Sequence, residues 1–355
     1  MPTVSVLMPA FNHARYVGAA IDSVLGQSLG DLELIVIDDA SADQTPQVIA
    51  EHTGDRRLRF SVHDANRGAT ETLNEALRLA TGDYVSILNS DDVYADDRLA
   101  QLVHLARASS ADLVMSDIAL IDSAGDIIDD PAHWWVSWFN GLKEQLRRTG
   151  SPLKAFLTGN LAITSSNFFL SRRAVDALGG FSAYRYVHDY DYVLRFLEHF
   201  GGERFTFAAG ARWLYYRLHH TNTIRTDPVG ANRETLELLL RSMQTFARNL
   251  DDDTLVILSN HATRLLGYLA DAHEQLRAAA LAQQGSRYEQ DLARERQASE
   301  ISELRSRQLE ARMITQEARI AELDHALHEV WGSSSFRLGH ALLSPLRWVG
   351  GRLAP

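Results

Sequence analysis

The sequence predicts an α/β fold in which a mostly parallel, twisted sheet is flanked by helices and followed by a helical, partly coiled-coil C-terminal region. Short apolar runs alternate with segments of helical periodicity over the first 120 residues, as in chains whose parallel strands are joined by helices. Three of these apolar runs end in acidic residues. Because the carboxyl ends of parallel strands meet at one edge of a sheet, we expect these acids to gather where open α/β sheets bind ligands.

The expected elements follow one another in a regular order. Apolar runs predict strands at residues 4–8, 32–37, 58–62, 84–88 and 112–115. Apolar residues at helical spacing predict helices at 14–25, 43–52 and 69–80, with a further helix before the last of these strands. Pro9 ends the first strand, Asp38 and Asp39 end the second, and Asp91 and Asp92 follow the fourth.

The rest of the chain divides into segments of different character. We expect a catalytic domain over residues 1–230, a helical extension over 231–285, a long helix or coiled coil over 286–330 and a basic amphipathic tail over 331–355. Heptad-like spacing, which suits a homodimer seam or a packed intramolecular helix, is found at Leu309, Met313, Ile320, Leu323, Leu327 and Val330. The tail carries two tryptophans, three arginines and no acid, so it suits either an anionic membrane surface or packing onto the domain.

Composition excludes several classes of function. The net charge of −11 argues against a nucleic-acid partner, because nothing offsets repulsion from a phosphate backbone. The lack of cysteine excludes disulfides, thiolate metal sites and cysteine nucleophiles. No signal-like leader precedes the first strand, and no apolar run is long enough to span a bilayer. We therefore expect a cytoplasmic protein, at most bound peripherally at the inner face of the cell membrane.

Two common phosphate-binding motifs are missing, and a third motif is out of place. No glycine fingerprint follows the first strand, and neither Lys143 nor Lys154 stands in the Gly-Lys-Ser/Thr setting of a phosphate-binding loop. Residues 26–30 read Gly-Gln-Ser-Leu-Gly, the pattern of a nucleophilic serine elbow. That elbow joins a strand to a following helix, whereas here the pattern follows a helix, so we interpret it as a chance match.

The paired carboxylates of Asp91 and Asp92 are the strongest candidates for chemistry. A departing diphosphate needs its charge compensated, and without a phosphate-binding loop a divalent cation is the usual means. Mg²⁺ or Mn²⁺ prefers carboxylate oxygens and keeps coordination positions for phosphate. The alternative is that the pair caps the next helix, but Asp96 or Asp97 suits that role better.

Several motifs together resemble the ordered signature of the family 2 inverting glycosyltransferases. They are residues 4–12 (VSVLMPAFN), 37–43 (IDDASAD), 66–68 (NRG), 88–92 (LNSDD), 188–195 (HDYDYVLR) and 216–219 (YRLH). The resemblance covers roughly residues 3–225 and implies the type A nucleotide-diphospho-sugar transferase fold. Motifs in the right order are far more specific than any one of them alone.

The resemblance implies which residues hold the nucleotide. Asp39, together with Asp38, would face the nucleotide base. The other residues expected around the base and ribose are Pro9, Phe11, Asn12, Asp64, Asn66 and Arg67. Asp91 would contact the ribose or the metal from beside Asp92.

The same resemblance implies the catalytic roles. Asp92, with Asp91 beside it, would bind a divalent cation (Mg²⁺ or Mn²⁺) that bridges the two phosphates of the donor. His219 would approach the metal or the diphosphate from the other side. Asp189 would be the general base that takes a proton from the acceptor hydroxyl.

The residues together with the resemblance imply a metal-dependent inverting glycosyltransferase that moves a sugar from a nucleotide-diphosphate donor to a glycan or lipid-linked acceptor. The expected role in the synthesis of bacterial surface polysaccharide rests on the resemblance and on the tail. Asn89 and His188 depart from the family pattern, in which Asp and Glu are common. They keep open a second hypothesis, an inactive transferase fold that acts as a scaffold through its coiled coil. A nucleotidyltransferase is a third, although its triphosphate would need a basic, glycine-rich first loop that this chain lacks.

Overall fold

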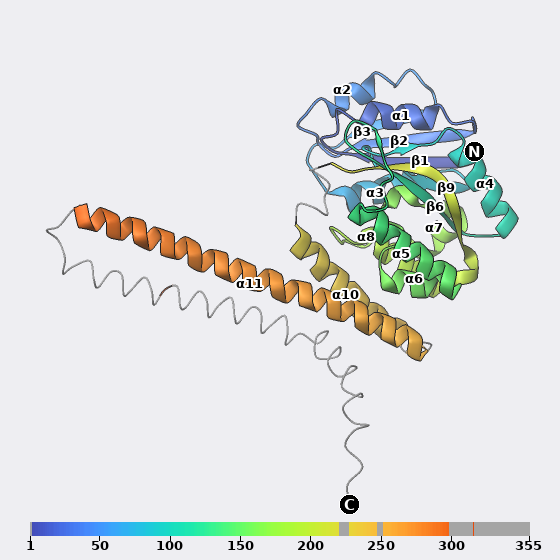
Figure 1. Ribbon diagram of the computed structural model, residues 1–355. Helices are drawn as coiled ribbons and strands as arrows, with labels where there is room; N and C mark the ends of the chain where they lie inside the picture. The colour runs from blue at the N-terminus through green and yellow to red at the C-terminus, as the bar shows by residue number, and fades with distance from the viewer. Residues whose placement is uncertain (1, 220–226, 247–250, 298–314, 316–355) are drawn as a thin grey trace, which may run out of the picture.

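The computed structural model describes residues 2–219, 227–246, 251–297 and 315, and a mixed β-sheet lies at its centre (Figure 1). Within these residues the sheet has nine strands in the order β3-β2-β1-β4-β8-β6-β9-β5, with β7 paired to β6. The strands are β1 (Val4–Ala10), β2 (Leu32–Asp38), β3 (Leu58–Val62), β4 (Tyr84–Ile87), β5 (Val93–Tyr94), β6 (Leu113–Ile121), β7 (Ile127–Ile128), β8 (Phe169–Ser171) and β9 (Phe205–Arg217).

Helices cover both faces of the sheet, with α1 and α2 on one side and α3 on the other (Figure 1). The α-helices are α1 (Val17–Leu25), α2 (Thr45–Ala50), α3 (Ala69–Leu79), α4 (Arg98–Ser109), α5 (Trp134–Thr149), α6 (Pro152–Thr158), α7 (Arg172–Leu178), α8 (His188–Phe200), α10 (Pro228–Phe246) and α11 (Asp252–Gln297). Two short 3-10 helices, η1 (Ser165–Asn167) and η2 (Gly202–Arg204), precede β8 and β9.

The first half of the sheet is parallel, as the alternation of strands and helices predicts. Strands β3, β2, β1 and β4 pair in parallel, and the side chains of β2, β1 and β4 are mostly buried, because helices cover these strands from both sides. The register aligns Ala10 of β1 with Asp38 of β2, and Asp38 with Val62 of β3. The carboxyl ends of these strands therefore form one edge.

The second half of the sheet is mixed. Strand β8 runs antiparallel between β4 and β6, and the long strands β6 and β9 pair in parallel beside it. The predicted fold class is confirmed, while the strand expected at 112–115 begins at Leu113 and continues to Ile121. Strand β5 closely follows β4 and pairs with β9 near the end of β9, at Arg217. The end of β9 therefore lies at the same edge of the sheet as the end of β4.

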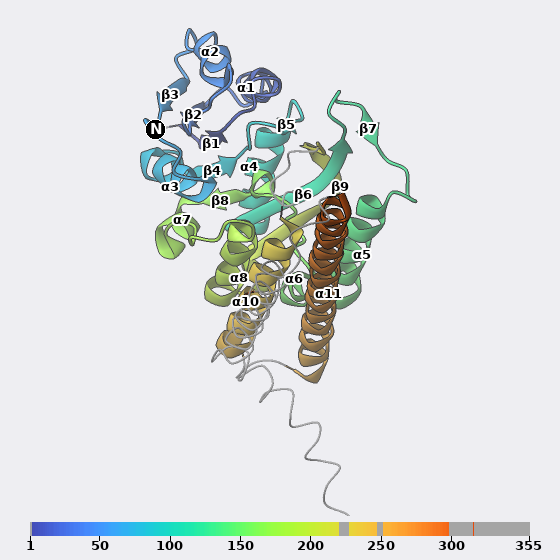
Figure 2. The same ribbon diagram turned by 90° about the vertical axis from the view of Figure 1, so that its left-hand side faces the viewer.

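The helices after the sheet pack against the domain. Helix α10 contacts α8, and α11 contacts both α10 and α6 (Figure 2). Leu238, Leu239 and Leu258 are fully buried in this contact region. Helix α11 then extends well beyond the domain (Figure 1). None of the helices described combines the length and the apolarity that crossing a membrane requires. Apart from Thr315, the heptad region over 309–330 and the tail over 331–355 lie outside the described residues.

Candidate active site

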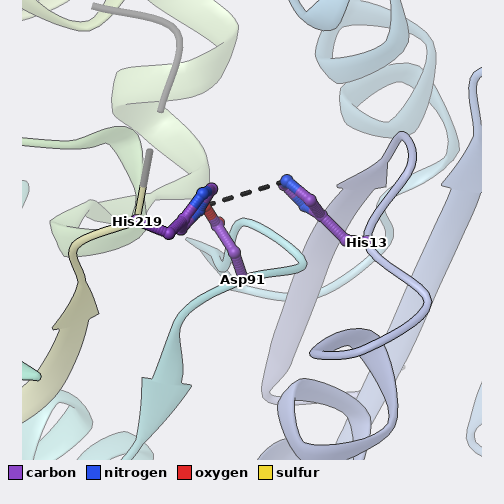
Figure 3. Close-up of side chains that lie close together, drawn as sticks. All are labelled: His13, Asp91 and His219. Atoms are coloured by element: carbon purple, nitrogen blue, oxygen red, sulfur yellow. Dashed lines mark hydrogen bonds and ion pairs between the residues drawn. The ribbon is translucent and has the colours of Figure 1, made fainter. Parts of the chain in front are cut away.

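Three side chains from distant parts of the chain converge at the carboxyl edge of the sheet (Figure 3). His13 follows β1, Asp91 follows β4, and His219 follows β9. The Nε2 atom of His219 hydrogen-bonds the Oδ2 atom of Asp91 at 2.8 Å, and the Nε2 atom of His13 lies 4.0 Å from the same oxygen. One ligand atom from each residue lies within 4.8 Å of the others, a spacing that a metal ion could bridge.

The surrounding contacts fix these three side chains in place. The Nδ1 atom of His13 hydrogen-bonds the Ser90 hydroxyl at 2.8 Å, which links the loop after β1 to the loop after β4. The Nε of Arg217 donates to the backbone carbonyl of Asp91 at 2.8 Å. The Tyr16 ring packs against the His219 ring, with 5.3 Å between centroids. Contacts among the segments that follow β1 and β4 and the end of β9 therefore fix the arrangement at this edge.

The charges and hydrogen bonds around Asp91 keep its carboxyl group ionised. Burial alone would raise the pKa of its carboxyl group, but the hydrogen bond from His219 and the charges of His13 and His219 outweigh burial and hold this pKa below its usual range. An ionised carboxylate flanked by two imidazoles is a suitable donor set for a divalent cation.

Asp92 is held differently from its neighbour. It is fully buried, and its carboxylate accepts hydrogen bonds from the Ser166 hydroxyl at 2.6 Å and from the backbone N–H of Arg217 at 2.9 Å. Burial, together with the nearby charge of Asp91, raises the pKa of Asp92 well above its usual range. The structure does not bring Asp92 into the group formed by His13, Asp91 and His219.

The two acids that end β2 organise the expected nucleotide pocket. Asp39 is buried and accepts hydrogen bonds from the backbone N–H groups of Arg67 and Gly68, each at 2.8 Å, and from Nδ1 of His63 at 2.7 Å. Burial opposes ionisation, but these hydrogen bonds outweigh it and lower the pKa of Asp39. Asp38 instead accepts from the hydroxyl and backbone N–H of Ser41, at 2.6 and 2.9 Å.

The other residues expected at the nucleotide pocket lie around these acids with more exposure. Asn12, in the left-handed backbone region at φ 54°, accepts a hydrogen bond from the backbone N–H of Ala42 at 2.8 Å. The amide of Asn66 donates to the Asp39 carbonyl at 3.2 Å. The Phe11 side chain is 43% exposed, which leaves an aromatic face for stacking. Pro9 is half-buried, and Asp64 and Arg67 are exposed.

Asp189 lies in the first turn of α8 and is buried. Its carboxylate accepts hydrogen bonds from the backbone N–H of Tyr190 at 2.7 Å and from Nδ2 of Asn160 at 3.2 Å. Burial raises the pKa of Asp189, the direction that suits a proton acceptor at neutral pH. Asp191, two residues on, is instead neutralised by ion pairs with Arg195 and Arg241. Within the part of the chain that the structure describes, Asp189 thus forms no ion pair with Arg or Lys, whereas Asp191 forms two.

The match with a known family decides the identity of the first half of the chain. Residues 5–179 match the family model described as glycosyl transferase family 2. The chain carries a family 2 glycosyltransferase domain. The matched range of this domain includes Asp39 and Asp91, whereas Asp189 and His219 lie beyond its end.

Relatives and solved structures are similar to the transferase domain in sequence and shape. The succinoglycan biosynthesis protein ExoO of Rhizobium meliloti is 33% identical over 125 residues, which are 35% of this chain and 36% of ExoO. The chain spans less than half the length of the first curated relatives it matches.

Two solved transferases show the fold. S. aureus TarS (residues 1–349, in complex with UDP-GlcNAc) has a TM-score of 0.55 at 18% identity, covering 75% of this chain and 73% of that one. The mannosyltransferase PcManGT of Pyrobaculum calidifontis, in complex with GDP-Man and Mn²⁺, has a TM-score of 0.51 at 20% identity, covering 79% and 80%. The type A fold that the motifs imply is thereby confirmed.

Two residues at or near the candidate site lie outside the sequence-based candidates. His13 directly follows Asn12 at the end of β1, and its position at the same sheet edge as Asp91 was the available signal. Val62 ends β3 beside Asp38 and is 50% exposed, so it adds an apolar surface near the expected base pocket. An exposed valine at the end of a strand gives no distinctive sequence signal.

Proposed function

We propose that this chain is a metal-dependent glycosyltransferase that moves a sugar from a nucleotide-diphosphate donor to a glycan or lipid-linked acceptor, with inversion at the anomeric carbon. The observation that carries the proposal is the meeting of Asp91 and His219 at the sheet edge, beside the loops that Asp39 ties together. The nucleotide sugars in the TarS and PcManGT complexes support the donor class.

The proposed cation ligands are Asp91 and His219. A carboxylate oxygen and an imidazole nitrogen 2.8 Å apart fit a divalent cation, and PcManGT is a transferase of this fold whose complex contains Mn²⁺. A bound Mg²⁺ or Mn²⁺ would supply positive charge for the departing diphosphate. The proposal gives Asp92 a positioning role instead, because its carboxylate already accepts hydrogen bonds from Ser166 and Arg217.

Asp189 is the proposed general base. Its pKa is raised by burial despite the nearby charge of His188, and its carboxylate accepts hydrogen bonds from the Asn160 amide and the Tyr190 backbone N–H. Such a carboxylate can take the proton of an acceptor hydroxyl as that oxygen attacks the anomeric carbon. Attack from the face opposite the leaving diphosphate inverts the configuration of that carbon.

The nucleotide is proposed to bind at the ends of β1, β2 and β3. Phe11 offers an exposed aromatic face and Val62 an exposed apolar one. Asn12 ties the loop after β1 to the loop after β2, and Asp39 ties the loop after β2 to the loop after β3. Asn66 and Arg67 follow in the loop whose backbone Asp39 anchors. The named function of ExoO in succinoglycan biosynthesis supports a polysaccharide product.

The test is to incubate the full chain with a panel of UDP-, GDP- and dTDP-sugars, with Mn²⁺ or Mg²⁺ and with a chelator. We expect one donor to stabilise the fold by about 2.7 kcal/mol at a hundredfold excess over its Kd. We also expect that donor to release its nucleotide diphosphate only when metal is present. Release by metal-free protein in chelator would reject the metal role. No binding of any donor would favour the scaffold, and release of pyrophosphate from a nucleoside triphosphate would favour a nucleotidyltransferase.

A further inference from the structure

His13 stands in an unusual relation to the proposed cation ligands. It comes from the loop between β1 and α1, and its Nε2 atom faces the Oδ2 atom of Asp91 at 4.0 Å (Figure 3). The His13 and His219 rings lie edge to face, with 5.7 Å between their centroids. The Nε2 atoms of both histidines therefore lie near the same oxygen of Asp91, on two sides of it.

The other nitrogen of His13 fixes which atom faces Asp91. Its Nδ1 hydrogen-bonds the Ser90 hydroxyl at 2.8 Å, and Ser90 is buried immediately before Asp91 in the chain. A metal-binding imidazole commonly has its second nitrogen held in this way, because the hydrogen bond fixes both the tautomer and the ring orientation. In the neutral imidazole whose Nδ1 proton is donated to Ser90, Nε2 has the lone pair that a cation needs.

Asn89 makes no such contribution to the group. Its amide donates to the Thr164 hydroxyl at 2.9 Å and accepts from the Ser165 hydroxyl at 3.2 Å. Its side chain is therefore committed to the segment around η1. Among the described residues, the side chains placed to share a cation are His13, Asp91 and His219.

We propose that His13 is a third cation ligand through Nε2, and that the resulting site of two imidazoles and one carboxylate prefers first-row transition cations to Mg²⁺. The proposal rests on the proposed function, in which Asp91 and His219 hold the cation. Mg²⁺ takes oxygen ligands almost entirely, whereas imidazole nitrogen favours transition cations, with affinity rising from Mn²⁺ to Co²⁺. Each added imidazole therefore widens the gap between Co²⁺ and Mg²⁺.

A second histidine–aspartate pair in the same half of the chain provides a matched control. The Nε2 of His52 lies 3.1 Å from Oδ1 of Asp22, while its Nδ1 contacts the Val48 carbonyl at 3.0 Å. This pair has the same chemistry as His13 and Asp91, but among the described residues no further histidine or acidic side chain lies close enough to make it a group of three possible cation ligands. Replacing His52 should therefore leave cation binding unchanged.

The experiment measures binding of Co²⁺, Mn²⁺ and Mg²⁺ by calorimetry to the full chain, alone and with UDP, for the wild type, His13→Gln, Asp91→Asn and the control His52→Gln. We expect His13→Gln to weaken Co²⁺ by at least about tenfold, the scale seen when support for a metal site is lost. Mg²⁺ binding should change much less. Thermal unfolding of each variant checks that the fold is retained.

A measurement on the unaltered protein covers the case in which His13→Gln does not fold. Pulsed electron paramagnetic resonance of bound Mn²⁺ detects coordinated imidazole nitrogens, and we expect two. A single nitrogen, or Co²⁺ affinity unchanged in His13→Gln but lost in Asp91→Asn, would overturn the role of His13 and leave the proposed function intact. Absence of any divalent-cation binding by the wild type would overturn both.

Discussion

Asp189 combines deep burial with an acidic side chain, so a change of one atom tests its role. We expect Asp189→Asn to reduce sugar transfer by about 10²–10⁴-fold, because the variant loses the proton acceptor but keeps its size and the bond from the Tyr190 N–H. Donor affinity by calorimetry should stay close to that of the wild type. Unchanged transfer would place the base elsewhere, whereas joint loss of binding and folding would make Asp189 structural.

The raised pKa of Asp189 also predicts how stability depends on pH. Because burial raises this pKa above the unfolded value, the protonated carboxyl is the form that favours folding, and that contribution is lost as pH rises through the folded pKa. The free energy of unfolding of Asp189→Asn should therefore equal that of the wild type below about pH 3.9 and exceed it at neutral pH. Urea titrations across pH measure the difference.

The exposed Asp64 supplies the comparison for this pH series. Asp64→Asn makes the same substitution at an exposed carboxyl group and gives the baseline for the pH dependence of Asp189→Asn. If the difference between Asp189→Asn and the wild type does not change with pH, burial does not penalise the ionised base in solution.

At the scale of single residues, the sequence identified the motifs but did not show which way each side chain points. Asp91 and His219 were expected near a metal and do meet. Successive residues after a strand can point to opposite sides, so adjacency alone could not say whether Asp91 or Asp92 faces His219. The position of His13 after the first strand was the available signal, but its bond to Ser90 spans 77 positions and no local pattern records it.

Between elements, Ser166 joins the end of β4 to η1. Its hydroxyl donates to Asp92 at 2.6 Å and accepts from the backbone N–H of Asn89 at 2.9 Å. We expect Ser166→Ala to lower the free energy of unfolding by about 1–3 kcal/mol, because it leaves buried polar groups unpaired. The exposed Ser61 on β3 gives the control Ser61→Ala, which should be near neutral.

Cation affinity shows whether Ser166 only links β4 to η1 or also supports the cation site. Ser166→Ala should bind Co²⁺ or Mn²⁺ like the wild type once corrected for any unfolded fraction, because Asp91 and His219 are untouched. Loss of cation binding in a folded Ser166→Ala protein would instead indicate that Asp92 is a metal ligand.

The elements of the parallel half could be predicted from the sequence, and those of the mixed half only in part. Buried strands β1, β2 and β4 read as continuous apolar runs, so their positions were evident. Strand β8 has three residues, too few to show a period. Strand β9 alternates poorly because most of its residues are only partly buried, and its pairing with β6 depends on contacts across the domain.

At the scale of the whole molecule, α10 packs against α8, which carries Asp189, and α11 packs against α6. Nδ1 of His261 on α11 hydrogen-bonds the Leu157 carbonyl of α6 at 2.9 Å, and Arg241 on α10 pairs with Asp191 of α8. We expect Leu258→Ala to lower the free energy of unfolding by about 2–5 kcal/mol, the cost of emptying a buried leucine site. Calorimetry should show one transition shifted as a whole; a separate early transition would make the helices an independent unit.

The C-terminal 25 residues carry a prediction that rests on sequence alone. Deleting 331–355 should leave turnover of soluble substrates intact and lower co-sedimentation with anionic vesicles, because the basic, tryptophan-containing segment suits a charged membrane surface. Neutral vesicles are the control. If the full-length protein ignores anionic vesicles as well, the tail packs onto protein rather than lipid.

The proposed cation ligands His13, Asp91 and His219 are far apart in the sequence, so the ribosome synthesises them at different times. His219 follows Asp91 by 128 positions, so at about 5–20 residues per second a ribosome delivers it roughly 6–25 s after Asp91. During that interval the nascent chain holds the segments that build the nucleotide pocket without the residue that completes the metal group. Under the proposed function, a chain released before the end of β9 would lack His219 and could not complete the cation site needed to release the nucleotide diphosphate.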